Sequence, residues 1–389
     1  MSVKGSPLQR AEGRLLRVTS FDFTRKIARI NWFFVILVVI LGGVGSLSLY
    51  SVTGGLDPYA KRQLVRLAVG FAMMLAIAFV DIRIIARIAW PFYAVSLVLL
   101  AMVLKFGSVG LGAERWLSIG GVAVQPSEFM KVALVLALAQ WFHRASWERV
   151  GNPLFLLPPL AATLAPVVLI LKEPNLGTAM IVLALGATIF FAAGVRWWKF
   201  ALVLALGGLA APVAFAHLHG YQKARILTFL DPARDPLGAG YNIIQAKIAL
   251  GSGGFWGQGF LHASQGRLDF LPEKETDFIF TLFAEQFGFV GSIALIGLLS
   301  LIVFSAGAIA LSSRHQFGRL VAFGIGMNFF LYVFVNLAMV MGLIPVGGVP
   351  LPLISYGGSA LLTTMASFGI LLSVQVHSDA DFTAKRETA

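Results

Sequence analysis

The sequence predicts an all-α, polytopic membrane protein, and two features of its composition point to this class. Hydrophobic residues make up 58% of the 389 residues, and the mean hydropathy is +0.84. Only 12% of the residues are charged, whereas soluble globular domains carry about 25%. A third observation agrees with these two. Long charge-free runs recur along the chain, and a membrane-spanning helix needs about 20 apolar residues.

These charge-free runs place about ten membrane-spanning helices. The expected helices lie at 30–56, 67–80, 88–104, 127–142, 150–171, 174–195, 200–215 and 278–311, with two more inside 320–378. The second run is short and has to include the aliphatic stem of Arg62 or Arg66, whose charged end can reach the membrane interface. The last run is divided by Pro345, Pro350 and Pro352, and we expect these prolines to end one helix and precede another.

Basic residues predict the orientation of the chain in the membrane. Lys and Arg are concentrated in the polar amino-terminal segment 1–31, in the tail 379–389 and in alternate short loops. The positive-inside rule therefore places both termini in the cytoplasm. The transmembrane domain spans 32–378, and its long hydrophilic segment 217–277, between the seventh and eighth helices, is then extracytoplasmic. Segment 1–31 lacks the apolar core of a cleavable signal peptide.

The composition also excludes several classes of function. The chain has no cysteine, so cysteine-ligated metal sites are excluded, and its six histidines lack the spacing of metal ligands. The chain has a formal net charge of +12. In so apolar a protein, an excess of basic residues is typical of loops that face anionic membrane lipids. The long loop 217–277 holds six basic and six acidic residues, which argues against a nucleic-acid partner. Because this loop is the only long hydrophilic segment between the expected helices, chemistry is expected at the outer membrane face.

Two charged residues lie unusually early in the fourth expected helix. Glu128 and Lys131 are three residues apart and share one helical face. They are either a local ion pair at the membrane interface or a cation and its orienting carboxylate inside a cavity, because ionisable groups in membrane segments often mark function. Arg115 and Trp116 precede this helix at an expected headgroup depth, where an aromatic belt is the simpler explanation for the tryptophan.

A group of acids lies at the start of the eighth expected helix, in LPEKETDFIFTLFAEQFGFVG. Glu273, Glu275 and Asp277 precede the apolar run, and Glu285 lies inside it. Asp277 could cap the helix by accepting hydrogen bonds from backbone N–H groups. Alternatively, the apolar boundary and the nearby Glu275 make its carboxylate hold a proton more readily, which suits a general base near neutral pH. Spacing alone leaves both interpretations open.

Longer motifs carry a family resemblance. The stretch LDPARDPLGAGYNIIQAKIALGSGGFWGQGFLHASQGRLDFLPEKETDFIFTLFAEQFG resembles the SEDS family (shape, elongation, division and sporulation). RWLSIGGVAVQPSEFMK, KEPNLGTA and GLIPVGGVPLPLISYGGSA match further family signatures in the expected order, so the resemblance covers about 32–376. The segments GAGYNIIQAKIALGSGG and ASQGRLDFLPEKETDFIF are similar to the rod-elongation members rather than to the division members.

This resemblance implies a peptidoglycan glycosyltransferase. Such enzymes polymerise lipid II, an undecaprenyl-pyrophosphate-linked disaccharide pentapeptide, at the outer face of the cytoplasmic membrane. The family's essential aspartate falls on Asp277, its outer-loop tryptophan on Trp116, and the Glu and Lys of its PSE motif on Glu128 and Lys131. The implied partners are a class B penicillin-binding protein, which is a transpeptidase, and the elongation machinery.

The chemistry that the resemblance implies agrees with these residues. A sugar hydroxyl needs a carboxylate base. Asp277 is the candidate, and Glu273 and Glu275 are expected to tune it. The leaving pyrophosphate needs positive charge, which Arg115, Lys131 or a bound Mg²⁺ could supply.

The chain departs from the family pattern at two positions. Glu275 stands where the family often has His, and this second acid could raise the proton affinity of Asp277 or help it hold a divalent cation. Asn175 stands where an acid is common, which puts a metal role for that position in doubt. Neither departure changes Asp277 itself.

Other functions stay open at this point. A lipid II flippase would also use intramembrane charges such as Glu128, Lys131 and Glu285 and a proline-broken helical region, although no inverted repeat is apparent. A scaffold that only docks the transpeptidase is a further alternative. A division-type member of the same family is the last.

Overall fold

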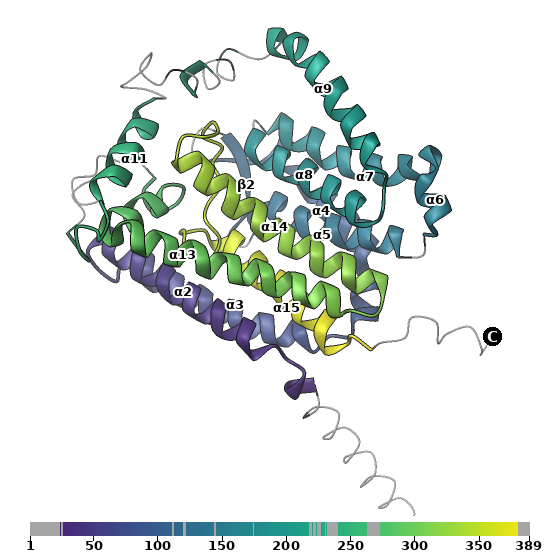
Figure 1. The fold of residues 1–389 in the computed structure, drawn as a ribbon, viewed down its shortest axis with the longest axis horizontal. Helices are drawn as coiled ribbons and strands as arrows, with labels where there is room; N and C mark the ends of the chain where they lie inside the picture. The colour runs from purple at the N-terminus through teal and green to yellow at the C-terminus, as the bar shows by residue number, and fades with distance from the viewer. Residues whose placement is uncertain are drawn as a thin grey trace, which may run out of the picture.

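The computed structural model is a helical bundle with one small sheet (Figure 1). It describes residues 24, 26–110, 113–119, 122–143, 145–173, 175–217, 220, 223, 227–229, 231, 240–262 and 273–379. Most of the segments 1–31 and 379–389, and much of the loop 217–277, therefore lie outside the described residues. The helices are α2 (Trp32–Thr53), α3 (Tyr59–Ala78), α4 (Ile82–Phe106), α5 (Pro126–Phe142), α6 (Trp147–Gly151), α7 (Pro153–Lys172), α8 (Leu176–Ala192), α9 (Trp197–His217), α11 (Tyr241–Ser252), α13 (Ile279–Ser312), α14 (Gln316–Val340) and α15 (Gly358–Val376).

The all-α membrane class is confirmed. Within the described residues six helices are long and apolar enough to cross a membrane: α2, α4, α7, α13, α14 and α15. Helices α3, α5, α8 and α9 lie where the remaining four spans are expected, but they are not among these six. The total of ten spans, with both termini on one side, remains a prediction.

Polar side chains set several helix starts. Asn31, Asp81, Asn152, Asn175 and His315 are the N-cap residues of α2, α4, α7, α8 and α14, and each side chain accepts a hydrogen bond from a backbone N–H of the first turn. Such caps satisfy amides that have no partner inside the helix.

Helix α14 runs through the middle of the bundle, with α13 on one side and α5 and α8 on the other (Figure 1). Helix α5 is also enclosed, because nearly all of its residues from Pro126 to Ala139 are buried. Charges on α5 therefore lie inside protein rather than in lipid. Helices α3 and α15 pack closely, since Gly70 lies against Met365 and Gly369 lies against the Met74 carbonyl oxygen, as small residues allow in membrane helices.

A short antiparallel sheet precedes α5 and was not predicted from the sequence. Its strands are β1 (Ser108–Gly110), β2 (Ala113–Ile119) and β3 (Val122–Val124), in the order β1–β2–β3. Strand β3 ends one residue before Gln125, the N-cap of α5. The sheet therefore leads directly into the helix that carries Glu128 and Lys131.

Helix α13 is broken inside the expected eighth span. Gly288 has φ 65° and ψ −162°, a conformation that is essentially restricted to glycine. The loop after α11 forms backbone hydrogen bonds with α13 on either side of this break. The Gln258 amide donates to the Glu285 carbonyl oxygen at 2.9 Å, and the Phe289 amide donates to the Gly254 carbonyl oxygen at 2.9 Å. A Cβ at Gly288 would collide with the backbone of Gly257. The loop after α11 is thus anchored against α13.

We predict that Gly288→Ala destabilises the protein by about 1–3 kcal/mol, because alanine is strained at this φ and ψ and its Cβ has no room. Thermal unfolding of the purified protein in detergent should begin at a lower temperature. The control is Gly251→Ala on α11, where a Cβ meets nothing within 4 Å. Equal melting temperatures for the two variants would contradict this view of the break.

Candidate active site

The segment 273–278, immediately before α13, is held against the segment that follows α14. The Asn336 side-chain amide donates to the Asp277 carbonyl oxygen at 2.9 Å and to that of Val349 at 2.7 Å. The Ser355 hydroxyl donates to the Thr276 carbonyl oxygen at 2.5 Å. These contacts fix the backbone around Asp277.

A further backbone contact involves Glu275. The amide of Tyr356 donates to the Glu275 carbonyl oxygen at 2.8 Å. Segment 349–356 therefore holds three consecutive residues, Glu275 to Asp277, directly or through Asn336. The proline-rich region that was predicted to separate two helices serves as the support for the acidic segment.

Asp277 is a buried carboxylate, with 9% of its surface exposed. The N-cap residue of α13 is Phe278 rather than Asp277, and no side chain caps the helix from that position. Asp277 therefore directly precedes the N-cap residue of this helix, and its role as the base stays a prediction. Its burial at the boundary of an apolar helix matches the environment expected for a base.

The neighbouring acids are more open. Glu273 and Glu275 are half-buried, and the Thr276 hydroxyl donates to the Glu273 carboxylate at 3.3 Å. Glu273 has φ 57°, which turns the chain sharply just before Asp277. Across the described residues, no group of three or more His, Asp or Glu could hold a metal ion.

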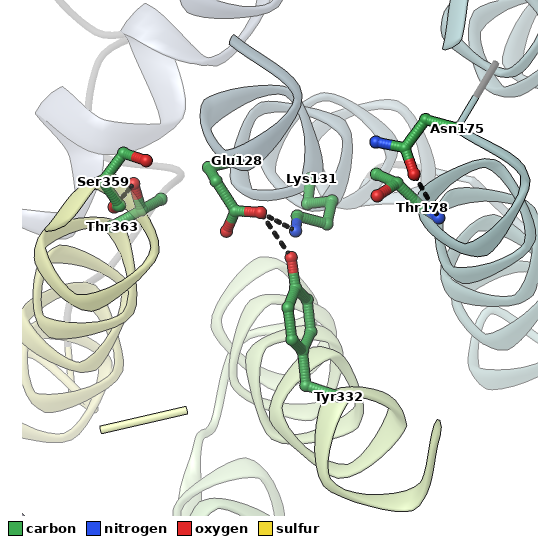
Figure 2. A network of polar contacts seen from close by, with 7 residues as sticks. All are labelled: Glu128, Lys131, Asn175, Thr178, Tyr332, Ser359 and Thr363. Carbon is green, nitrogen blue, oxygen red and sulfur yellow. Dashed lines mark hydrogen bonds and ion pairs between the residues drawn. The ribbon is translucent and has the colours of Figure 1, made fainter. Parts of the chain in front are cut away.

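Glu128 and Lys131 form a buried network with Tyr332 (Figure 2). The Lys131 ammonium donates to Glu128 Oε1 at 2.7 Å, and the Tyr332 hydroxyl donates to the same oxygen at 2.6 Å. The ammonium also lies 3.9 Å from the centre of the Tyr332 ring. Since Lys131 is 1% exposed and Glu128 6%, they form an ion pair that is buried inside the protein.

Other polar residues flank this network. Figure 2 shows Asn175 and Thr178 of α8 on one side of Lys131, and Ser359 and Thr363 of α15 on the far side of Glu128. The Asn175 side chain accepts from the Thr178 amide at 3.3 Å and so caps α8. An aspartate could cap this helix equally well, so the departure from the family at Asn175 leaves the local fold intact.

Helix α14 contacts both parts of the candidate site, the Glu128–Lys131 pair and the acidic segment 273–278. Tyr332 contacts the Glu128 carboxylate and Asn336 contacts the Asp277 backbone. These two residues are four apart and therefore lie on the same helical face. Sequence analysis missed both because it searched the charge-free runs only for charged residues. The available signal was a pair of uncharged polar residues spaced by one turn in an apolar helix.

The two remaining candidate residues, Arg115 and Trp116, lie on strand β2. Trp116 is half-buried on β2, where it pairs with Ser108 of β1. The Arg115 side chain lies outside the described residues. Both belong to β2, which precedes α5 in the chain.

Comparisons with known proteins agree with the motifs. A family model described as "Cell cycle protein", for FtsW, RodA and SpoVE, matches residues 28–380. The peptidoglycan glycosyltransferase MrdB of Escherichia coli K12 is 40% identical over 337 residues, which cover 85% of this chain and 90% of that protein.

Solved structures agree as well. A chain of a peptidoglycan synthase complex, studied for the coordination of polymerization and crosslinking, has a TM-score of 0.80 and 33% identity. The match covers 90% of this chain and 99% of that one. The rod shape determining protein RodA of Thermus thermophilus has a TM-score of 0.69 and 30% identity, with coverage of 90% and 98%. The chain is therefore a multi-pass membrane protein that belongs to the SEDS family, the family of FtsW, RodA and SpoVE.

Proposed function

We propose that this protein is a peptidoglycan glycosyltransferase that polymerises lipid II during cell elongation. The observation that carries the proposal is the buried Asp277, whose backbone is tied to α14 and to the segment after it. Membership of the SEDS family and 40% identity to a peptidoglycan glycosyltransferase over most of the chain support it.

In the proposed reaction Asp277 acts as the general base. The 4-OH of an incoming GlcNAc attacks the anomeric carbon of the MurNAc that ends the growing strand, with inversion. Its proton passes to the Asp277 carboxylate, the new C–O bond forms, and the bond to the undecaprenyl pyrophosphate breaks. Pyrophosphate leaves as an anion, so the second carboxylic acid of a glycosidase is not needed. The half-buried Glu273 and Glu275 would tune the proton affinity of Asp277.

Glu128 and Lys131 have two proposed roles. Their position in the family's PSE motif supports substrate binding, with the Lys131 charge directed at the pyrophosphate. Their burial supports a second role, in which the ion pair fixes Tyr332 and therefore the register of α14 against α5. Because Asn336 is on the same helix, this register also sets the position of Asp277. Arg115 and Trp116 remain proposed substrate contacts.

A divalent cation remains a proposal. Asp277 and Glu275 offer two carboxylates, while their backbone carbonyl oxygens already accept from Asn336 and Tyr356. Mg²⁺ commonly binds one or two carboxylates together with substrate phosphates, so this pair fits an ion that the substrate completes. Such an ion would supply positive charge for the leaving group.

The proposed setting is the bacterial inner membrane. Both termini would face the cytoplasm and the 217–277 loop the outside, as the distribution of Lys and Arg predicts. A class B penicillin-binding protein is the proposed partner, supported by the similarity to a chain of a peptidoglycan synthase complex. Membrane lipids and the growing glycan strand are further proposed partners.

A lipid II flippase is the second candidate function. Helix α13 is interrupted at Gly288, and discontinuous helices with buried polar groups also line transport pathways. Purified protein with labelled lipid II separates the two functions. Polymer formed in detergent supports the enzyme, whereas movement across liposomes without polymer supports the flippase.

We predict that Asp277→Asn lowers the rate of lipid II polymerisation by at least about 10²-fold, because the base is lost. The variant should keep its melting temperature, since the backbone oxygen that accepts from Asn336 is retained. Labelled glycan product resolved on a gel measures the rate. Near-normal polymer from the folded variant would refute the assignment of the base.

Lys131→Ala should destabilise the protein by about 3–5 kcal/mol, because it leaves the Glu128 carboxylate buried without its counter-charge. The double variant Glu128→Gln/Lys131→Met should regain most of this stability, since it removes both charges together.

The double variant then separates the two roles of the pair. If Lys131 contacts the pyrophosphate, the stable double variant polymerises lipid II poorly. If the pair only positions α14, activity returns with stability. Melting temperature and polymerisation rate, measured on the same preparation, give the answer. A Lys131→Ala protein as stable as wild type would contradict the buried pair itself.

A further inference from the structure

The first turn of α15 opens beside the segment that supports Asp277. Its N-cap residue is Gly357, which has no side chain to cap the helix. The first amides of a helix lack partners within it and carry a partial positive charge of roughly half a unit. Tyr356, one residue before this cap, donates its amide to the Glu275 carbonyl oxygen at 2.8 Å. The start of α15 therefore directly follows a residue that binds the acidic segment before Asp277.

An arginine from α3 lies against the same helix end. The Arg66 guanidinium lies 4.6 Å from the centre of the Tyr356 ring. A Cβ built on Gly358 would lie 3.0 Å from the Arg66 Cζ atom, so the guanidinium lies close against the start of the helix. The Arg66 Nη1 atom is buried and has no hydrogen-bond partner among the described residues.

A buried hydroxyl adds a further donor. Ser359, the second residue of α15, is 7% exposed, and its Oγ atom has no hydrogen-bond partner within the described part of the chain. Side chains of a helix lean towards its N-terminus, so this hydroxyl leans towards the uncapped turn. Burying a polar group without a partner is unfavourable, so two such donors at one helix end suggest a ligand.

The shared property of these groups is that they donate to an anion. Backbone amides at a helix N-terminus bind phosphate groups, and the planar guanidinium of arginine matches the oxygens of phosphate. No ion pair of Arg66 with a carboxylate is present among the described residues. A ligand that supplies negative charge would therefore satisfy the site.

We propose that the N-terminus of α15, with Arg66 and Ser359, binds a phosphate-class anion, namely the diphosphate of a polyprenyl-diphosphate sugar. The inference rests on the proposed glycosyltransferase function and adds to it a site for the leaving group. When the anomeric C–O bond breaks, its electron pair stays on the diphosphate, and the proton from the attacking hydroxyl goes to Asp277. Charge then develops on the diphosphate, where fixed donors stabilise it most.

Binding measured without catalysis tests this site. The full chain carrying Asp277→Asn is titrated in detergent with farnesyl diphosphate and, separately, with inorganic pyrophosphate, by calorimetry. Adding Arg66→Gln should weaken both affinities at least about tenfold, since a hydrogen bond to a charged group is lost. Arg66→Lys should give an intermediate affinity, and Ser359→Ala a loss of about threefold.

The control is Lys61→Gln, which removes one positive charge from the same helix. Lys61 is exposed and pairs with Asp57 at 3.5 Å, so its loss should change neither affinity by more than about twofold. Melting temperatures confirm that each variant is folded, and Arg66→Lys serves if Arg66→Gln does not fold.

Unchanged affinity in folded Arg66→Gln overturns the site, as does equally tight binding of farnesol, which lacks the diphosphate. Tighter binding of farnesyl diphosphate than of pyrophosphate identifies the lipid-linked anion, and equal binding identifies the free anion. Either result supports the site if it depends on Arg66. Polymerisation by the Asp277→Asn protein would refute the proposed base and leave these affinities valid.

Discussion

The Asn336 side chain holds the candidate site in one arrangement. It is fully buried and donates to the carbonyl oxygens of Asp277 and Val349. Those residues belong to irregular segments on either side of the α13–α14 pair, so their buried carbonyl oxygens have no sheet or helix ladder to satisfy them. Loss of such a donor costs about 1–3 kcal/mol for each group left unsatisfied. One amide therefore couples the acidic segment, the proline-rich segment and α14.

The same helix connects this coupling to the charges on α5. Tyr332, one turn from Asn336, donates to the Glu128 carboxylate that also binds Lys131. Because Glu128, Lys131 and Tyr332 are all buried, these contacts lie in a medium where an unpaired charge is costly. The proposed base and the proposed anion site at α15 are also connected to each other. Ser355 and Tyr356, just before α15, donate hydrogen bonds to the carbonyl oxygens of Thr276 and Glu275, just before Asp277.

Much of the fold could be predicted from the sequence. Charge-free runs locate the helices, and a spacing of three places Glu128 and Lys131 on one face. The contact of Asn336 with Asp277 could not be predicted, since it joins residues 59 positions apart through packing rather than periodicity. The break at Gly288 was missed for a similar reason: the apolar run continues through it, and the backbone hydrogen bonds at the break come from the loop after α11.

The most direct measurement is the steady-state kinetics of lipid II polymerisation by Asn336→Ala protein. Asn328→Ala is the matched control, because Asn328 lies two turns earlier on α14 and has no described bond to Asp277. If Asn336 positions the base, kcat falls by at least about tenfold in a folded protein, since small misplacements of catalytic groups are costly, and the control keeps its rate. Wild-type kcat in folded Asn336→Ala would contradict that role.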